Sequence, residues 1–210
     1  MLIPLEQLNR KYKLDVHSVL HIGAHECEEL GDYVRLGVDV EKIYWLEANP
    51  ELVQKMKHRY IPNVFQAAVS DTVEVVDFII TNNYQSSSIL ELEEHLKEHP
   101  HVFETTRIKL ETIRVEQLLD EWSKNTEFKM PNFVNLDIQG AELKALKGFG
   151  NYLEQVDYVY SEINTKCLYK NCALLPEMNE FLEQKGFRMV EIKHTQHGWG
   201  DAFYMRQSLL

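Results

Sequence analysis

The chain has 210 residues, 44% of them hydrophobic and 26% charged, which is typical of one globular domain. Acidic residues (33) exceed basic ones (22), and the formal net charge of -11 argues against nucleic acid as the main partner, because phosphate backbones require a basic surface. No apolar run is long enough to predict a membrane span.

The cysteines and the N-terminus predict a cytoplasmic location. Cys27, Cys167 and Cys172 form no Cys-x-x-Cys pair and leave one thiol over, which disfavours a disulfide framework or structural zinc and favours a reducing compartment. Residues 1–4 do not resemble a signal peptide.

The first elements are predicted to be a helix, a strand and a second helix. Leu5, Leu8 and Tyr12 recur at helical spacing, so residues 4–13 form an amphipathic helix and residues 1–16 an N-terminal helical cap. A strand covers 17–22. The helix after it carries on one face Leu30, Tyr33, Val34 and Gly37.

Strands are next predicted at 43–47 and 64–68. The helix between them starts at Asn49, a preferred N-cap residue, with Pro50 in the first helical position. Its inward face is expected to contain Leu52, Val53, Met56 and Tyr60.

Residues 73–115 interrupt the strand–helix alternation. The segment 73–80 reads as an antiparallel strand, 81–88 as a polar loop, 91–98 as a charged surface helix and 106–115 as a strand. We expect this insertion to lie between the third and fourth core strands and to shape a binding site.

Alternation then resumes with a helix at 115–122, a strand at 133–137 and a helix at 140–146, closed by Gly148 as the C′ residue. A strand at 156–163 and a helix ending before Gly186 follow. Strands at 187–193 and 202–206 then form a hairpin around the turn 197–201. The chain is thus predicted to be a single α/β domain over residues 1–210. It has a mostly parallel sheet, helices on both faces and one antiparallel edge strand.

Two strand ends predict a nucleoside site. The first strand breaks at Gly23, where the backbone can approach a ligand, and the second ends in Glu47, which can accept hydrogen bonds from ribose hydroxyls. A dinucleotide site would need Gly-x-Gly-x-x-Gly, but His25 and Glu28 stand at the other two glycine positions. The acidic turn favours a phosphate-free nucleoside with positive charge, such as S-adenosylmethionine.

Polar groups also end two later strands. Burying a carboxylate such as Asp137 at the end of an apolar strand costs free energy unless the group is paired with a partner or serves in binding or catalysis. Glu162 and Asn164 end the neighbouring strand. Two interpretations stay open: the three side chains bind a divalent cation such as Mg²⁺, or they orient substrate hydroxyls and each other without a metal. His194 and His197, near the final turn, are weaker candidates for a base.

From about His17 to Arg206 the chain resembles the FkbM family of S-adenosylmethionine-dependent methyltransferases. The resemblance rests on ordered blocks: Ile22-Gly23-Ala24-His25, Leu46-Glu47-Ala48-Asn49-Pro50, Ala67-Ala68-Val69-Ser70-Asp71, Gln85-Ser86-Ser87-Ser88-Ile89, Leu136-Asp137-Ile138-Gln139-Gly140-Ala141-Glu142, Leu146-Lys147-Gly148, Gly186-Phe187 and Asp201-Ala202-Phe203-Tyr204. It implies the class I, Rossmann-like methyltransferase fold with seven strands. It also implies methylation of a hydroxyl oxygen, often on a sugar, a glycoconjugate or a natural product.

The resemblance also implies roles by position. Gly23, Ala24 and His25 would line the methionine part of the cofactor, and Glu47 would bind the ribose hydroxyls. Around the adenosine and the reacting methyl group, the cofactor contacts would be completed by Ala48, Asn49, Ser70 (or Val69), Asp71 and Asp137. Apart from the resemblance, the strand-end carboxylates Asp137 and Glu162 are candidates for the base, either directly or through a metal that lowers the pKa of the acceptor hydroxyl. The polar loop 85–88 suits an acceptor with several hydroxyl groups, although it could equally be a solvated linker. The expected acceptor contacts are Gln85, Ser86, Ser87, Ser88, Gln139 and Glu142.

Two positions depart from the family pattern. His21 stands where an acid is usual, and Cys27 stands where glycine is common. His21 could bind the amino-acid part of the cofactor or be a core histidine satisfied by neighbours.

The leading hypothesis is an O-methyltransferase with a small-molecule or glycan acceptor. The alternatives are a methyltransferase of a non-carbohydrate small molecule, lipid or peptide, and a non-catalytic cofactor-binding module. The oligomeric state stays open, with a homodimer among the options.

Overall fold

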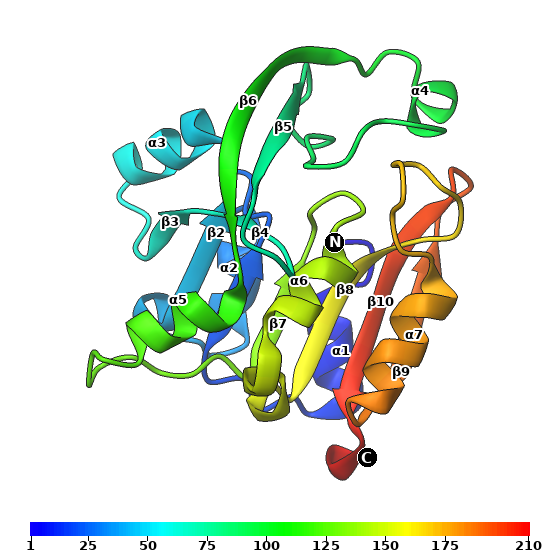
Figure 1. Ribbon diagram of the computed structural model, residues 1–210. Coiled ribbons are helices and arrows are strands. Elements are labelled where there is room, and N and C mark those ends of the chain that lie inside the picture. The colour runs from blue at the N-terminus through cyan, green and yellow to red at the C-terminus, as the bar shows by residue number, and fades with distance from the viewer.

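The computed structural model describes residues 1–210. Its main sheet contains β1 (Val19–Ile22), β2 (Ile43–Glu47), β3 (Val64–Gln66), β7 (Phe133–Leu136), β8 (Tyr158–Asn164), β9 (Phe187–His194) and β10 (Trp199–Arg206). These seven strands lie in the order β3-β2-β1-β7-β8-β10-β9 (Figure 1). β3, β2, β1, β7 and β8 are parallel to one another, whereas β10 runs antiparallel to both β8 and β9. The predicted, mostly parallel seven-stranded sheet is confirmed, with the antiparallel hairpin at one edge.

Helices cover both faces of this sheet, as predicted. The helices are α1 (Leu5–Tyr12), α2 (Leu30–Arg35), α3 (Pro50–His58), α4 (His95–Glu98), α5 (Val115–Trp122), α6 (Glu142–Gly148) and α7 (Leu175–Gln184), with 3-10 turns at Val40–Lys42, Gly150–Gln155 and Gln207–Leu209. One hydrophobic core joins α5, α6 and α7 to one face of the sheet, and a second joins α1, α2 and α3 to the other. Because both faces are covered, every residue of β1, β2 and β7 is buried.

A smaller sheet is built from the insertion. It contains β4 (Ala68–Val69), β5 (Val75–Thr81) and β6 (Glu104–Ile113) in the order β4-β6-β5. β5 and β6 are antiparallel and extend beyond the main sheet, where residues 82–103 connect them through α4 (Figure 1). This connection bonds to the loop after β8, since Glu93 N–H and His95 N–H donate to Leu168 O at 2.9 and 3.1 Å. We call residues 82–103 the roof.

Two inward-facing predictions are wrong. Tyr60 is 92% exposed because α3 ends at His58 and Tyr60 leaves the helix with φ +56°. Val34 is 45% exposed, because the short helix α2 buries only Tyr33.

Two further local predictions need correction. Gly148 is not a C′ residue; it is the last residue of α6, and a Cβ there would lie 2.4 Å from Ser70 O. Close packing against that backbone therefore explains this glycine. Of the surface helix predicted at 91–98, only α4 (His95–Glu98) is helical, and its residue His95 is buried.

The predicted start of α3 is confirmed. The Asn49 side chain accepts a hydrogen bond from Glu51 N–H at 3.0 Å, and Pro50 occupies the first turn. None of the helices combines the length and the apolar composition that a membrane crossing requires.

Candidate functional site

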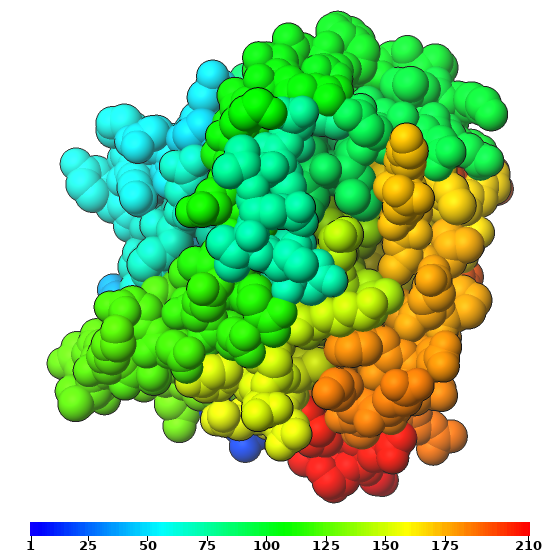
Figure 2. Space-filling view, in the orientation of Figure 1, coloured from blue at the N-terminus to red at the C-terminus, as the bar shows by residue number.

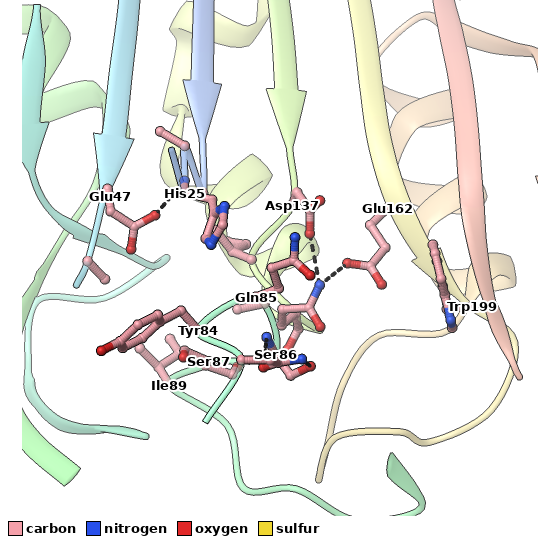
Figure 3. Close-up of a pocket in the computed structure, with 18 of the residues that line it drawn as sticks. His25, Glu47, Tyr84, Gln85, Ser86, Ser87, Ile89, Asp137, Glu162 and Trp199 are labelled. Atoms are coloured by element: carbon pink, nitrogen blue, oxygen red, sulfur yellow. Dashed lines mark hydrogen bonds between the residues drawn. The ribbon is translucent and has the colours of Figure 1, made fainter. Parts of the chain in front are cut away.

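A cavity of about 510 Å³ lies between the carboxyl ends of β1, β2, β7 and β8 and the roof, whose residues 84–89 are in the lower part of Figure 3. In the space-filling view the roof, in green, and the loop after β8, in gold, meet above the sheet (Figure 2). A volume of this size suits a small-molecule ligand or cofactor. The carboxyl ends of parallel strands are also where such sheets bind ligands.

Gly23 shapes the turn after β1. Its φ is +90°, and a Cβ at this position would lie 1.8 Å from Asp137 O, so only glycine lets this turn cross the end of β7. The N–H groups of Gly23 and Ala24 donate to Leu46 O at 2.9 and 3.0 Å, which ties the turn to β2. The turn therefore brings backbone to the floor of the cavity.

Glu47 ends β2 beside that turn. Its two carboxylate oxygens accept hydrogen bonds from His25 N–H and Asn49 N–H, each at 2.8 Å (Figure 3). Burial raises the pKa of Glu47, and these backbone donors oppose that rise. Each oxygen keeps a further lone pair, with which it can accept a hydrogen bond from a ligand hydroxyl.

His21 is both satisfied by neighbours and part of the cavity lining. Asn135 Nδ2 donates to the Tyr33 hydroxyl at 2.8 Å, and that hydroxyl lies 3.1 Å from His21 Nδ1. The hydroxyl proton is thus directed at Nδ1. Burial lowers the pKa of His21, so the ring is neutral, and its Nε2–H is the remaining donor.

Asp137 and Glu162 face each other across the amide of Gln139. Gln139 Nε2 donates to Asp137 Oδ1 at 2.8 Å and also to Glu162 Oε2 (Figure 3). The Tyr169 hydroxyl donates to Gln139 Oε1, which fixes the orientation of the amide. Gln139 has φ +57°, a left-handed conformation that belongs to the tight turn after β7. The result is a carboxylate pair held by one carboxamide.

The environment of Glu162 favours its protonated form. Burial, first, and then the charges of Asp137 and Glu142 hold the pKa of Glu162 well above its ordinary value.

Glu142 stabilises the turn after β7 through hydrogen bonds and does not line the cavity. Its Oε1 accepts hydrogen bonds from Ile138 N–H and Gly140 N–H at 3.0 and 3.1 Å. Burial raises the pKa of Glu142 to about 7. Its role here is to hold the backbone that presents Gln139.

The side chains proposed as metal ligands do not form a ligand cluster. No group of three or more His, Cys, Asp or Glu side chains is arranged to hold a metal ion. The Gln139 amide lies between Asp137 and Glu162, and the side-chain amide of Asn164 is buried without a partner, outside the cavity lining. We therefore derive no step through a metal.

The fold brings most of the predicted site residues to one cavity. Those that line it are His21, Gly23, Ala24, His25, Glu47, Ala48, Gln85, Ser86, Ser87, Ser88, Asp137, Gln139 and Glu162. Those that do not line it are Asn49, Ser70, Asp71, Glu142 and Asn164. Asn49 caps α3, and the Ser70 hydroxyl donates to Asp71 at 3.2 Å.

Several lining residues were not predicted from the sequence. They include Trp199, Asp201, His95, His99 and His101. Tyr169, which bonds to Gln139 from outside the cavity lining, was not predicted either. Asp201 stands in one of the quoted sequence blocks, and its carboxylate accepts from Tyr160 Oη and Leu2 N–H. Nothing in the local sequence distinguishes Tyr169. Of the two weaker base candidates, His194 is exposed and His197 contacts Glu98 Oε2 at 3.3 Å; neither lines the cavity.

Sequence comparison identifies one matching family. The family model described as the methyltransferase FkbM domain matches residues 21–189. A curated protein, the 2-O-methyltransferase NoeI of Sinorhizobium fredii (strain NBRC 101917 / NGR234), is 24% identical over 163 residues, which are 72% of this chain and 65% of NoeI. The chain thus spans slightly less than two thirds of this relative.

Solved structures share the fold. Methyltransferase FkbM from Methylobacillus flagellatus KT superposes with a TM-score of 0.56 at 13% identity, over 90% of this chain and 43% of that one. Magnesium protoporphyrin IX methyltransferase (ChlM) from Synechocystis PCC 6803, solved with bound S-adenosylmethionine, gives a TM-score of 0.50 at 9% identity, over 96% and 76%. The predicted class I methyltransferase fold is confirmed.

Proposed function

Because the chain belongs to the methyltransferase FkbM domain family, we propose that it is an S-adenosylmethionine-dependent O-methyltransferase acting on a hydroxyl of a sugar, a glycoconjugate or a related natural product. One observation carries this proposal: the Gly23 turn, Glu47 and the Asp137–Glu162 pair face a single cavity. The printed name of NoeI, a 2-O-methyltransferase, supports the oxygen acceptor. The S-adenosylmethionine bound to ChlM supports the cofactor.

The half of the cavity at β1 and β2 suits the cofactor. The turn residues Gly23, Ala24 and His25 would contact its methionine part, and Glu47 would accept from the ribose hydroxyls. The adenosine would be bounded by Ala48 and Val69, whereas Asn49, Ser70 and Asp71 lie outside the cavity lining. His21 would offer its Nε2–H to the cofactor carboxylate. The acids Glu28 and Glu29, which also line this half, complement a ligand with an ammonium and a sulfonium.

The carboxylate pair would act on the acceptor. S-adenosylmethionine supplies an electrophilic methyl group, and transfer breaks its carbon–sulfur bond as a carbon–oxygen bond forms. The acceptor hydroxyl must lose its proton, which would pass to the Asp137–Glu162 pair, with Asp137 as the accepting carboxylate while Glu162 is protonated. Gln139 holds the pair through two hydrogen bonds, so the accepting oxygens are placed before substrate arrives. Alignment of acceptor and methyl group can supply roughly 7–11 kcal/mol of the rate enhancement.

The insertion 73–115 would shape the acceptor half. Its roof presents the side chains of Gln85, Ser86, Ser87 and Ser88 to the cavity, opposite the strand ends (Figure 3). Ser88 Oγ donates to Gln139 O at 2.9 Å, so the roof contacts the residue that holds the base. Amides and hydroxyls on one side and carboxylates on the other suit an acceptor with several hydroxyl groups.

Calorimetry with purified protein tests the cofactor. We expect binding of S-adenosylhomocysteine and no binding of nicotinamide dinucleotides. Glu47→Gln should weaken that binding about 10- to 100-fold, the loss of one charge-assisted hydrogen bond. Glu6→Gln, at an exposed position on α1, is the matched control and should bind as the unmodified protein does. Binding of dinucleotides in place of S-adenosylhomocysteine would contradict the proposal.

Transfer of an isotope-labelled methyl group tests the reaction. The labelled cofactor is incubated with panels of sugars, glycosides, lipids, peptides and small natural products, and products are identified by mass. We expect an O-methylated sugar or related hydroxyl compound, with turnover lost in Asp137→Asn. Label only on lipid, peptide or non-carbohydrate products would favour the alternative methyltransferase. Tight cofactor binding with no product in any panel would favour a non-catalytic module.

A further inference from the structure

The charged side chains in the cavity lining are mainly acidic. The acids are Glu28, Glu29, Glu47, Asp137, Glu162 and Asp201, and no lysine or arginine lines the cavity. The Met1 ammonium also lines it, 3.9 Å from Glu29 Oε1. The first three acids belong to the half proposed for the cofactor, whose ammonium and sulfonium would offset them. The other three lie on β10 or at the ends of β7 and β8, in the acceptor half. Asp201 is the cross-strand partner of Glu162.

The acceptor half already resists additional negative charge. The pKa of Glu162 is held well above its ordinary value by burial and by the charges of Asp137 and Glu142. The pKa of Asp201 is also raised, first by burial. A phosphate placed beside them would be disfavoured by the same burial and by the charge of Asp137, with no lysine or arginine in the cavity lining to offset it.

Most groups that could offset an anion are engaged or neutral: the Met1 ammonium lies 3.9 Å from Glu29 Oε1, and His25 Nδ1 lies 2.6 Å from Glu28 Oε1. Consecutive N–H groups in a left-handed turn often bind phosphate, but Ile138 N–H and Gly140 N–H both donate to Glu142. In the roof, burial lowers the pKa of His95 to about 4 and also lowers that of His99. Both rings are therefore uncharged at neutral pH.

The remaining lining groups suit an uncharged sugar. The roof offers amide and hydroxyl groups at Asn83 and at 85–88, and Trp199 borders the far side of the acceptor half (Figure 3). Amides and hydroxyls bond to sugar hydroxyls, and a flat indole can cover the apolar face of a sugar ring.

We infer that the acceptor is a sugar without phosphate, a glycoside or a sugar within an assembled glycan, and that sugar phosphates and nucleoside-diphosphate sugars are rejected. This inference rests on the proposed function and specifies its substrate class. It also fixes the order of two reactions, glycosyl transfer and methylation. Glycosyl transfer, which releases the nucleoside diphosphate from an activated sugar, must supply this substrate, so methylation follows it.

Binding to the protein saturated with S-adenosylhomocysteine tests the inference. The probes are methyl glycosides of a panel of hexoses and 6-deoxyhexoses, the matching sugar 1-phosphates and the matching nucleoside-diphosphate sugars. They are compared at pH 7.5 by saturation-transfer NMR and calorimetry. We expect at least one glycoside to bind about 100-fold more tightly than its 1-phosphate, the factor that one unscreened like-charge pair at roughly 5 Å supplies. Equal or tighter binding of the phosphate, or no binding of any glycoside, would overturn the inference.

A charge added to the roof provides a second test. Gln85→Arg should raise the affinity of the 1-phosphate relative to the glycoside at least about 10-fold. Gln184→Arg, on the exposed side of α7, is the matched control and should leave the ratio unchanged. A ratio unaffected by Gln85→Arg would contradict the charge argument.

The two proposals can fail separately. Glycoside binding without any transfer of labelled methyl would leave the substrate class standing and contradict the methyltransferase. Methyl transfer to a sugar phosphate with a kcat/KM equal to that of its glycoside would support the methyltransferase and contradict the inferred substrate class.

Discussion

Replacing Glu142 by glutamine should make the protein more stable at neutral pH but not at pH 4.5. Glu142 is buried, and its Oε1 accepts hydrogen bonds from Ile138 N–H and Gly140 N–H. The carbonyl oxygen of a glutamine can accept the same two hydrogen bonds, so the turn after β7 is retained. The variant therefore removes the charge of this side chain while keeping its contacts.

The size of the effect follows from the pKa of Glu142. Burial raises it from 4.5 to about 7, so between these pH values the native state binds a proton that the unfolded state has released. Stability contributed by this proton is complete below pH 4.5 and is lost as the pH rises through 7. A shift of this size corresponds to about 3 kcal/mol, since one pKa unit is roughly 1.4 kcal/mol. Glutamine does not ionise, so Glu142→Gln lacks this loss.

Urea unfolding at a series of pH values measures the difference. The free energy of unfolding of Glu142→Gln minus that of the unmodified protein should rise from near zero at pH 4.5 to about 3 kcal/mol above pH 7. Glu6→Gln controls for removal of an exposed carboxylate and should give a flat difference. A flat difference for Glu142→Gln as well would refute the reasoning that burial disfavours its charge.

Further predictions concern two glycines and one histidine. Gly23→Ala places a Cβ 1.8 Å from Asp137 O and should lower the melting temperature and abolish S-adenosylhomocysteine binding; unchanged calorimetry would contradict this. Gly148→Ala places a Cβ 2.4 Å from Ser70 O and should reduce the free energy of unfolding by about 1–3 kcal/mol in urea titrations, with an unaltered midpoint as the opposing result. Because burial lowers the pKa of His95 from 6.5 to about 4, the unfolded state binds its proton first and stability should fall as the pH drops through this range. His95→Phe should flatten that part of the curve, and a curve of unchanged slope would count against it.

Much of the fold could be predicted from short stretches of sequence. The apolar runs at 19–22 and 43–47 are buried strands because helices cover both faces of a parallel sheet. The start of α3 follows from Asn49 and Pro50 alone, since an N-cap involves only neighbouring residues. The error at Tyr60 also has a local origin, because helical spacing continues in a sequence after the helix itself has ended. Val34 lies within α2, but that short helix buries only Tyr33.

The site could be predicted in part. Gly23, Glu47 and Asp137 were identified because each stands at the end of an apolar run, a position that parallel sheets direct toward one edge. The bridge from Gln139 to Glu162 and the contact from Tyr169 could not be predicted. They depend on strand order and on where the loop after β8 packs.

The sequence by itself determined the elements, the mixed α/β class and the strand-end residues, because burial and capping depend on side chains within a few positions of one another. Only the tertiary structure decided that Gln139 bonds to both carboxyl groups, that Glu142 lies outside the cavity, and that the roof closes over the strand ends. The Gln139–Glu162 and Ser88–Gln139 hydrogen bonds join segments far apart along the chain. They form only when both cores have packed on the sheet.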